Sequence, residues 1–185
     1  MLLGHYPADP AVAARRRIRA NARRFESGVF CISLERHSDR WRSLAERLMR
    51  WGLEAERIDA VDGRALVAAP PAARSAEQCE APALSPGELG CLASHRLAIE
   101  TGQRRGLNCV LVLEDDACLH RRFGERLAEL AAIGDDWDLL YLGSSQYDRR
   151  AVRFVNAHCY RARKTLGTFA YAMRHTLFDK FLFQT

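Results

Sequence analysis

Residues 109–119 read CVLVLEDDACL, an apolar run that ends abruptly in three carboxylates, Glu114, Asp115 and Asp116. Apolar residues at every position, rather than at alternate ones, are typical of a strand buried on both faces in the centre of a parallel sheet. We therefore predict a strand within residues 107–119. Neighbouring carboxylates repel one another and are costly to bury, so this strand end predicts a cation or a polar ligand beside it.

The segment before this strand has the pattern of a βαβ unit. Residues 28–36 are apolar and β-prone, and residues 55–63 predict a second, short strand that ends at an Asp-Gly pair. Between them, the sequence predicts a helix with Ser38 as its N-cap and Gly52 as its stop signal. Apolar residues recur at helical spacing at Trp41, Leu44, Ala45, Leu48 and Trp51. Such a unit predicts a parallel sheet, and the Ala- and Pro-rich residues 64–83 predict a surface loop after it.

The clearest helix start in the chain lies just before the apolar strand. Ser85 as N-cap, Pro86 at the first helical position and Glu88 three residues after the cap form a capping box. We predict a helix over residues 84–106 that is bracketed at its end by two glycines. Its expected buried stripe consists of Leu89, Leu92, Ala93 and Leu97.

The C-terminal part of the chain continues the alternation of helices and strands. The pattern predicts a helix over 120–134, a strand over 137–145, extended segments within 151–174 and a helix that begins near residue 175. The whole predicts an α/β fold with a mostly parallel sheet flanked by helices. We expect one domain over residues 28–185.

The net charge of +5 is concentrated in an N-terminal extension. Residues 1–27 contain six arginines against Asp9 and Glu26, which gives this segment +4 and leaves +1 for the rest. The six arginines are Arg15, Arg16, Arg17, Arg19, Arg23 and Arg24. A basic helix over 15–24 would suit a peripheral contact with anionic membrane, although a solvated extension is the alternative. The near-neutral body and the low aromatic content argue against a nucleic-acid partner.

The composition also bears on the cellular location of the protein and on the function of its cysteines. No apolar stretch approaches the roughly 20 residues of a membrane span, and the N-terminus lacks the apolar core of a secretory signal. A cytoplasmic location is therefore expected. The six cysteines are irregularly spaced with no C-x-x-C motif, so we expect neither a disulfide framework nor a zinc module.

The three carboxylates are expected to divide between two faces of the sheet. Successive side chains of a strand point to opposite faces, so Glu114 and Asp116 should point the same way and Asp115 away from them. Ligands of open α/β sheets bind beyond the carboxyl ends of the strands. Asp116, together with Glu114, is the expected metal ligand for a hard divalent cation. A solvated acidic loop is the alternative.

Two other interpretations of these motifs remain open. The EDD sequence resembles the acidic pocket of response-regulator receiver domains, but residues 155–170 contain no Asp to serve as phosphoacceptor. Glu88, Cys91 and His95 share one face of the predicted helix. They could bind a soft metal, but a packed helix face with a hydrogen-bonded histidine is the simpler expectation.

Taken together, the motifs resemble glycosyltransferase family 25 over about residues 28–182. The matching pieces, in order, are CISLERHSDR (31–40), IDAVDG (58–63), LSPGELGCLASH (84–95), VLVLEDDACL (110–119), WDLLYLG (137–143) and GTFAYAMR (167–174). The resemblance implies a GT-A-like, Rossmann-type fold. It further implies metal-assisted transfer of a hexose, with galactose as the expected sugar, from a UDP-sugar to a lipooligosaccharide or other surface glycan.

The resemblance also implies the composition of the site. It places Mn²⁺, or Mg²⁺, at Asp116 with Glu114. It places near the nucleotide sugar Ser33, Leu34, Arg40, Asp62, Gly63, Ser94, His95, Glu114 and Asp115. A lipid-linked acceptor would fit a protein held at the inner membrane through its basic extension.

Two departures from the family pattern affect these expectations. Ser33 stands where the family usually has Asn, and the chain ends short of where family members usually end. An inverting transfer needs a general base near the acceptor hydroxyl, for which Asp148 is the candidate. A truncated or vestigial transferase that binds nucleotide or a partner without turnover is therefore the second hypothesis. A metal-dependent hydrolase using the same carboxylates is the third.

Overall fold

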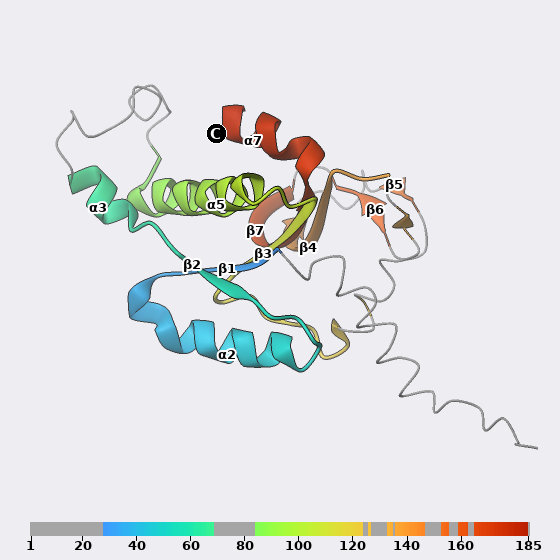
Figure 1. The fold of residues 1–185 in the computed structure, drawn as a ribbon, viewed down its shortest axis with the longest axis horizontal. Helices are drawn as coiled ribbons and strands as arrows, with labels where there is room; N and C mark the ends of the chain where they lie inside the picture. The colour runs from blue at the N-terminus through green and yellow to red at the C-terminus, as the bar shows by residue number, and fades with distance from the viewer. Residues whose placement is uncertain are drawn as a thin grey trace, which may run out of the picture.

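The computed structural model describes residues 28–68, 84–123, 126, 133–134, 136–146, 153–155, 159–162 and 165–184 (Figure 1). The elements, in chain order, are β1 (Val29–Ser33), the 3₁₀ turn η2 (Glu35–His37), α2 (Ser38–Met49), β2 (Glu56–Asp59), α3 (Gly63–Ala68), α5 (Pro86–Arg104), β3 (Cys109–Glu114), β4 (Leu139–Gln146), β5 (Arg153–Phe154), β6 (Tyr160–Arg161), β7 (Thr165–Arg174), the 3₁₀ turn η6 (His175–Leu177) and α7 (Phe178–Gln184). The basic extension and Asp148 lie outside the described residues.

Five of these strands form one sheet in the order β2-β1-β3-β7-β4. β1 pairs in parallel with both β2 and β3, whereas β7 runs antiparallel to β3 and to β4. Four strands therefore point in one direction and β7 in the other. The predicted α/β domain with a mostly parallel sheet is confirmed.

Strand β3 is buried on both faces, as its apolar run predicts. Leu111 and Leu113 face a core shared with α2, and Val110 and Val112 face a second core shared with α5 and α7. Figure 1 shows α2 on one side of the sheet and α5 and α7 on the other. The helices cover both faces of the sheet, so a ligand can reach the sheet at the ends of its strands.

The first predicted helix forms, but it begins differently from the prediction. His37 is the N-cap of α2 and makes no side-chain capping bond, and Ser38 is already helical. The η2 turn feeds directly into α2, so the assignment of Ser38 as N-cap is wrong. Gly52 adopts a left-handed φ of 76° three residues after the helix ends, as its stop role predicts.

The predicted loop over 64–83 is wrong for its first residues, which form α3. The backbone N–H of Arg64 donates to the Asp62 carboxylate at 3.0 Å, and the N–H of Ala65 donates to the Asp62 carbonyl. Asp62 thus starts a helix where the sequence predicted a strand end followed by loop. Residues 69–83 lie outside the described part of the chain.

Helix α5 begins at the predicted capping box, but its buried face differs from the predicted one. The leucines and Ala93 of the expected stripe are only half-buried. The buried residues are Gly90, Ser94, His95, Ala98, Ile99, Thr101 and Gly102. Small and polar side chains occupy this face because α3 and the sheet approach α5 closely, as Gly90 shows below.

We expect Ser85→Ala to lower the free energy of unfolding by about 1 kcal/mol, since it removes the side chain that accepts from the Glu88 N–H. Urea unfolding monitored by circular dichroism measures the change. Ser43→Ala, at an exposed interior position of α2, is the matched control and should change stability by less. Equal effects of the two substitutions would contradict a capping role.

The C-terminal elements agree with the predictions where the structure describes them. β4, β7 and the helix after residue 175 are present, and Gly167 has a left-handed φ of 82° within β7. The helix predicted over 120–134 lies largely outside the described residues. Among the described helices, none combines the length and apolarity that a bilayer crossing requires.

Candidate functional site

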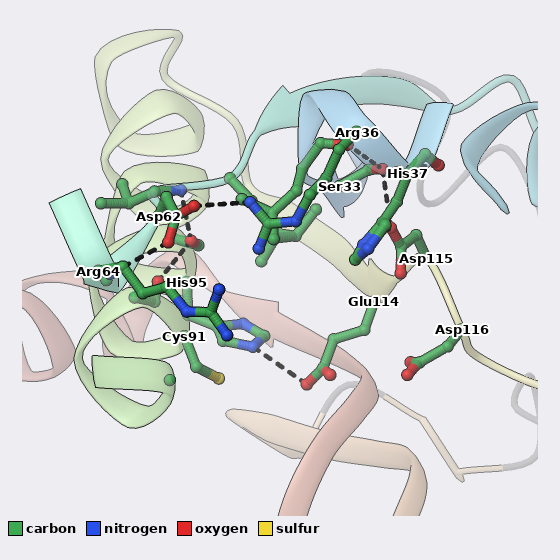
Figure 2. Close-up of a pocket in the computed structure, with 18 of the residues that line it drawn as sticks. Ser33, Arg36, His37, Asp62, Arg64, Cys91, His95, Glu114, Asp115 and Asp116 are labelled. Atoms are coloured by element: carbon green, nitrogen blue, oxygen red, sulfur yellow. Dashed lines mark hydrogen bonds and ion pairs between the residues drawn. The ribbon is translucent and has the colours of Figure 1, made fainter. Parts of the chain in front are cut away.

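A pocket of about 530 Å³ lies at the carboxyl ends of β1, β2 and β3 (Figure 2). Its lining comes from the segments that follow these three strands and from the N-terminal half of α5. This is the edge at which open α/β sheets bind ligands, and the volume is in the range of small-molecule sites. Of the predicted site residues that the structure describes, all except Arg40 line it.

Asp115 joins β3 to the β1–α2 segment. The Ser33 hydroxyl donates to its carboxylate at 2.8 Å, and His37 and Arg40 approach it at 3.8 Å and 3.6 Å. Ser33 is almost completely buried. Ser33 and Asp115 are thus structural partners of each other. Arg40 contacts Asp115 but does not line the pocket.

Glu114 belongs to a different network, on the α5 side of β3. The Thr168 hydroxyl donates to Glu114 Oε1 at 2.9 Å and lies 2.9 Å from His95 Nε2. His95 Nδ1 lies 3.1 Å from the Tyr171 hydroxyl, and Nε2 lies 3.4 Å from Glu114 Oε1. Thr168 and Tyr171 both come from β7, so this strand holds His95 and Glu114 from behind the pocket lining.

The two ionisable groups of this network stabilise each other's charged forms. Burial of the imidazole favours its neutral form, but hydrogen bonds to Cys91 and Glu114 outweigh burial and raise the pKa of His95 to about 9. The bond from His95 holds the pKa of Glu114 below its usual range. Burial raises the pKa of Tyr171, which stays a neutral hydroxyl.

This pair predicts that stability falls at high pH. With a pKa raised from 6.5 to about 9, His95 contributes stability that is fully present below pH 6.5 and is lost as the pH rises through 9. The contribution corresponds to about 3 kcal/mol. The difference in unfolding free energy between the native protein and His95→Gln should therefore shrink by this amount between pH 6 and pH 10.

Urea unfolding at the two pH values measures this difference. His175→Gln, which removes an exposed histidine from a 3₁₀ turn, controls for the loss of an imidazole elsewhere in the chain. A difference for His95→Gln that stays constant with pH would show that the imidazole is not charged in the folded protein.

Asp116 has no side-chain hydrogen bond or ion pair among the described residues, and it is exposed. Figure 2 shows its carboxylate facing the same space as Glu114, while Asp115 is turned toward His37. Of the three carboxylates, Asp115 and Glu114 already have protein partners. Asp116 is thus the one that remains available to a ligand from solution.

Basic side chains that the sequence analysis did not select also line the pocket. Arg36 donates to Asp62 at 2.6 Å, and this bond lowers the pKa of Asp62. Arg64 and His37 line the same cavity. Arg36 lies four residues before Arg40 in the same motif. It belongs to η2 and lines the pocket, whereas Arg40 belongs to α2 and does not.

Ser94 and Gly63 both have structural roles in the packing of α5 against the segment that follows β2. The Ser94 hydroxyl donates to the Gly90 carbonyl at 2.5 Å and accepts from the Val61 N–H at 2.9 Å, which ties α5 to the segment after β2. A Cβ on Gly63 would lie 1.5 Å from the carbonyl oxygen of Pro86. Gly63 therefore permits the contact between α3 and α5 that forms one wall of the pocket.

A second cavity of about 670 Å³ lies on the β4–β7 side of Asp116. Its lining is mostly apolar and includes Tyr141, Leu142 and Phe169, with His120 and Arg126 among the polar residues. Asp116 lines both cavities. One carboxylate therefore lies at the boundary between a polar pocket and a largely apolar one.

The domain is thus of the open α/β class, and its charged pocket lies at the carboxyl ends of the parallel strands, where proteins of this class bind their ligands. The family model described as glycosyltransferase family 25 (LPS biosynthesis protein) matches residues 26–182, and the chain belongs to this family. The resemblance found in the sequence is confirmed.

Some relatives are named as galactosyltransferases, and others are named as inactive members of the family. The chain is 34% identical over 126 residues to procollagen galactosyltransferase 1 of Danio rerio, covering 62% of this chain and 21% of that protein. It is 37% identical over 131 residues to the inactive glycosyltransferase 25 family member 3 of Mus musculus, covering 64% and 22%. The probable inactive member 3 of Bos taurus is 31% identical over 158 residues, covering 78% and 27%. The chain thus matches about a quarter of the length of these relatives.

Proposed function

We propose that this chain is a hexosyltransferase that moves galactose from a UDP-sugar to a lipooligosaccharide or other surface glycan, on a GT-A-like domain in the cytoplasm. The observation that carries the proposal is the position of Asp116. This carboxylate has no side-chain partner among the described residues and lies between the polar pocket and the apolar cavity. We assign the donor to the first and the acceptor to the second.

The donor pocket has the charges that a nucleoside diphosphate requires. Arg36, His37 and Arg64 line it and can neutralise phosphate oxygens. Asp62, which already binds Arg36, and Leu34 lie beside them, where the nucleoside would enter. The guanidinium groups and a hard cation would share the charge that develops on the departing nucleotide.

A hard divalent cation, Mn²⁺ or Mg²⁺, fits the carboxylates of the pocket. Asp116 and the Glu114 oxygen that does not bind Thr168 are oxygen donors, which these cations prefer. We assign Asp116 and Glu114 as the residues that hold the cation. When bound, such a cation supplies charge stabilisation to the diphosphate leaving group.

The second candidate function is binding of the nucleotide without turnover. The names of several relatives, which describe them as inactive, favour this candidate. The two functions differ in whether the chain supplies a general base to the acceptor hydroxyl. Asp148 is the candidate for this base, and it lies outside the described part of the chain. A metal-dependent hydrolase remains the third hypothesis.

Calorimetric titration of UDP into the purified chain, with and without Mn²⁺, tests the proposal. We expect binding that depends on the metal. Incubation with UDP-galactose, with and without glycan acceptors, then separates the functions. Transfer only with acceptor supports a transferase, release of galactose without acceptor supports a hydrolase, and tight binding without either supports the inactive form. Absence of UDP binding by the folded protein under both conditions would overturn the proposal.

A further inference from the structure

We propose that Cys91, His95 and Glu114 form a second metal site, which takes a thiophilic divalent cation of the zinc class. The thiolate, imidazole and carboxylate ligand atoms of these residues all lie within 4.8 Å of one another. The site shares Glu114 with the hard-cation site at Asp116 but differs from it in chemistry, because a sulfur and a nitrogen supply two of its three donors. This inference goes beyond the proposed function and does not depend on nucleotide binding.

The backbone already brings the three ligands together. Cys91 and His95 are four residues apart on α5 and so lie on one face of the helix, and Glu114 reaches them from the end of β3. Figure 2 shows the three side chains converging on one side of the pocket. His95 Nε2 and Glu114 Oε1 are 3.4 Å apart. Tetrahedral zinc with bonds of about 2.1 Å sets its nitrogen and oxygen ligands about 3.4 Å apart.

The groups behind the ligands are those that orient metal ligands in proteins. The Tyr171 hydroxyl lies 3.1 Å from His95 Nδ1, which leaves Nε2 to face Glu114. The Thr168 hydroxyl donates to Glu114 Oε1. Binding of the metal replaces the contact between Thr168 and Nε2 but can retain the bond to Glu114. Outer partners of this kind fix the tautomer and the direction of the ligands.

The site is open on one side. Zinc sites with three protein ligands likewise keep a fourth position for water or substrate. All three ligands line the donor pocket, and Cys91 is exposed there, whereas His95 is 4% exposed. A metal ion can therefore enter from the pocket and displace two protons to solvent, one from the Cys91 thiol and one from the charged imidazole of His95. Sulfur selects such an ion over Mn²⁺ and Mg²⁺, which prefer oxygen.

Cobalt substitution tests the site directly, because a cysteine thiolate bound to Co²⁺ gives a ligand-to-metal charge-transfer absorption band. We expect one equivalent of Co²⁺ to produce this band in the full chain, and Zn²⁺ to abolish it by displacement. Cys91→Ser should lose the band. Cys118→Ser removes another exposed thiol and should retain it. A band that persists in Cys91→Ser, or that is absent from the native chain, would overturn the proposal.

Two further variants separate ligation from folding. Thr168→Val keeps the three ligands and removes the hydroxyl behind Glu114, so we expect Zn²⁺ to bind about 10- to 100-fold more weakly in competition with a chromophoric chelator. Asp116→Asn should leave the cobalt band unchanged. Loss of the band in Asp116→Asn would show that the thiol is not part of a separate site. Circular dichroism of each variant verifies that it is folded.

A consequence for the donor site does rest on the proposed function. Because Glu114 contributes to both metal sites, Zn²⁺ should weaken the Mn²⁺-dependent binding of UDP to the native chain but not to Cys91→Ser. If UDP fails to bind at all while the cobalt band forms, the zinc site stands and the transferase proposal falls. Zinc inhibition that is equal in both proteins would contradict the shared use of Glu114.

Discussion

Asp116→Asn should abolish most of the manganese-dependent binding of UDP while leaving the stability of the fold nearly unchanged. The side chain is exposed and has no partner among the described residues, so folding does not depend on its charge. We expect the metal-dependent affinity to fall by about 100-fold or more, since even the loss of an outer partner of a metal ligand costs about 10- to 100-fold. Calorimetry with Mn²⁺ and urea unfolding measure the two quantities.

Two other aspartates serve as controls for this experiment. Asp39→Asn removes an exposed charge in α2, outside the pocket, and should leave both quantities unchanged. Asp115→Asn removes the negative charge that faces Ser33, His37 and Arg40 and should lower the unfolding free energy by about 1–3 kcal/mol. Native affinity of Asp116→Asn for UDP in the presence of Mn²⁺ would remove this residue from the metal site.

Gly90→Ala should destabilise the domain by about 1–3 kcal/mol, although alanine is the better helix former. An added Cβ would lie 2.7 Å from the Gly63 nitrogen and 2.7 Å from the Val61 carbonyl oxygen, which are backbone atoms that cannot move aside. The cost of this overpacking should outweigh the roughly 1 kcal/mol that the helix gains from alanine. Denaturant unfolding gives the change.

Gly87→Ala is the matched control, because it lies one turn earlier in α5 with no atom closer than 4.0 Å to the added Cβ. This variant should be neutral or slightly more stable. The displaced segment around Val61 lines the donor pocket, so Gly90→Ala should also weaken UDP binding. Equal stability of the two variants would show that α3 and α5 can separate at little cost.

The sequence predicts well those features that neighbouring residues determine. The capping box of α5 depends on Ser85, Pro86 and Glu88 alone, and the burial of β3 follows from its uninterrupted apolar run. The three carboxylates at its end lie in the predicted pocket. Each of these signals is contained within a few consecutive positions.

Features that depend on distant segments could not be predicted in this way. The buried face of α5 is set by its contact with α3, so small residues rather than the leucine stripe face inward. Thr168 meets Glu114 across 54 positions of the chain, and no local pattern announces that pairing. Similarly, the direction of β7 and the choice of Arg36 over Arg40 follow from how the chain turns between elements.

The place of β7 in the sheet has a consequence for how the protein is made. This strand comes after the other four in the chain, yet it lies between β3 and β4. As the nascent chain leaves the ribosome, the segment up to residue 146 can pair β2, β1 and β3, but β4 has no neighbour until residues 165–174 arrive. Thr168 and Tyr171 arrive with that strand, so His95 acquires both of its hydroxyl partners only when synthesis of the sheet is complete.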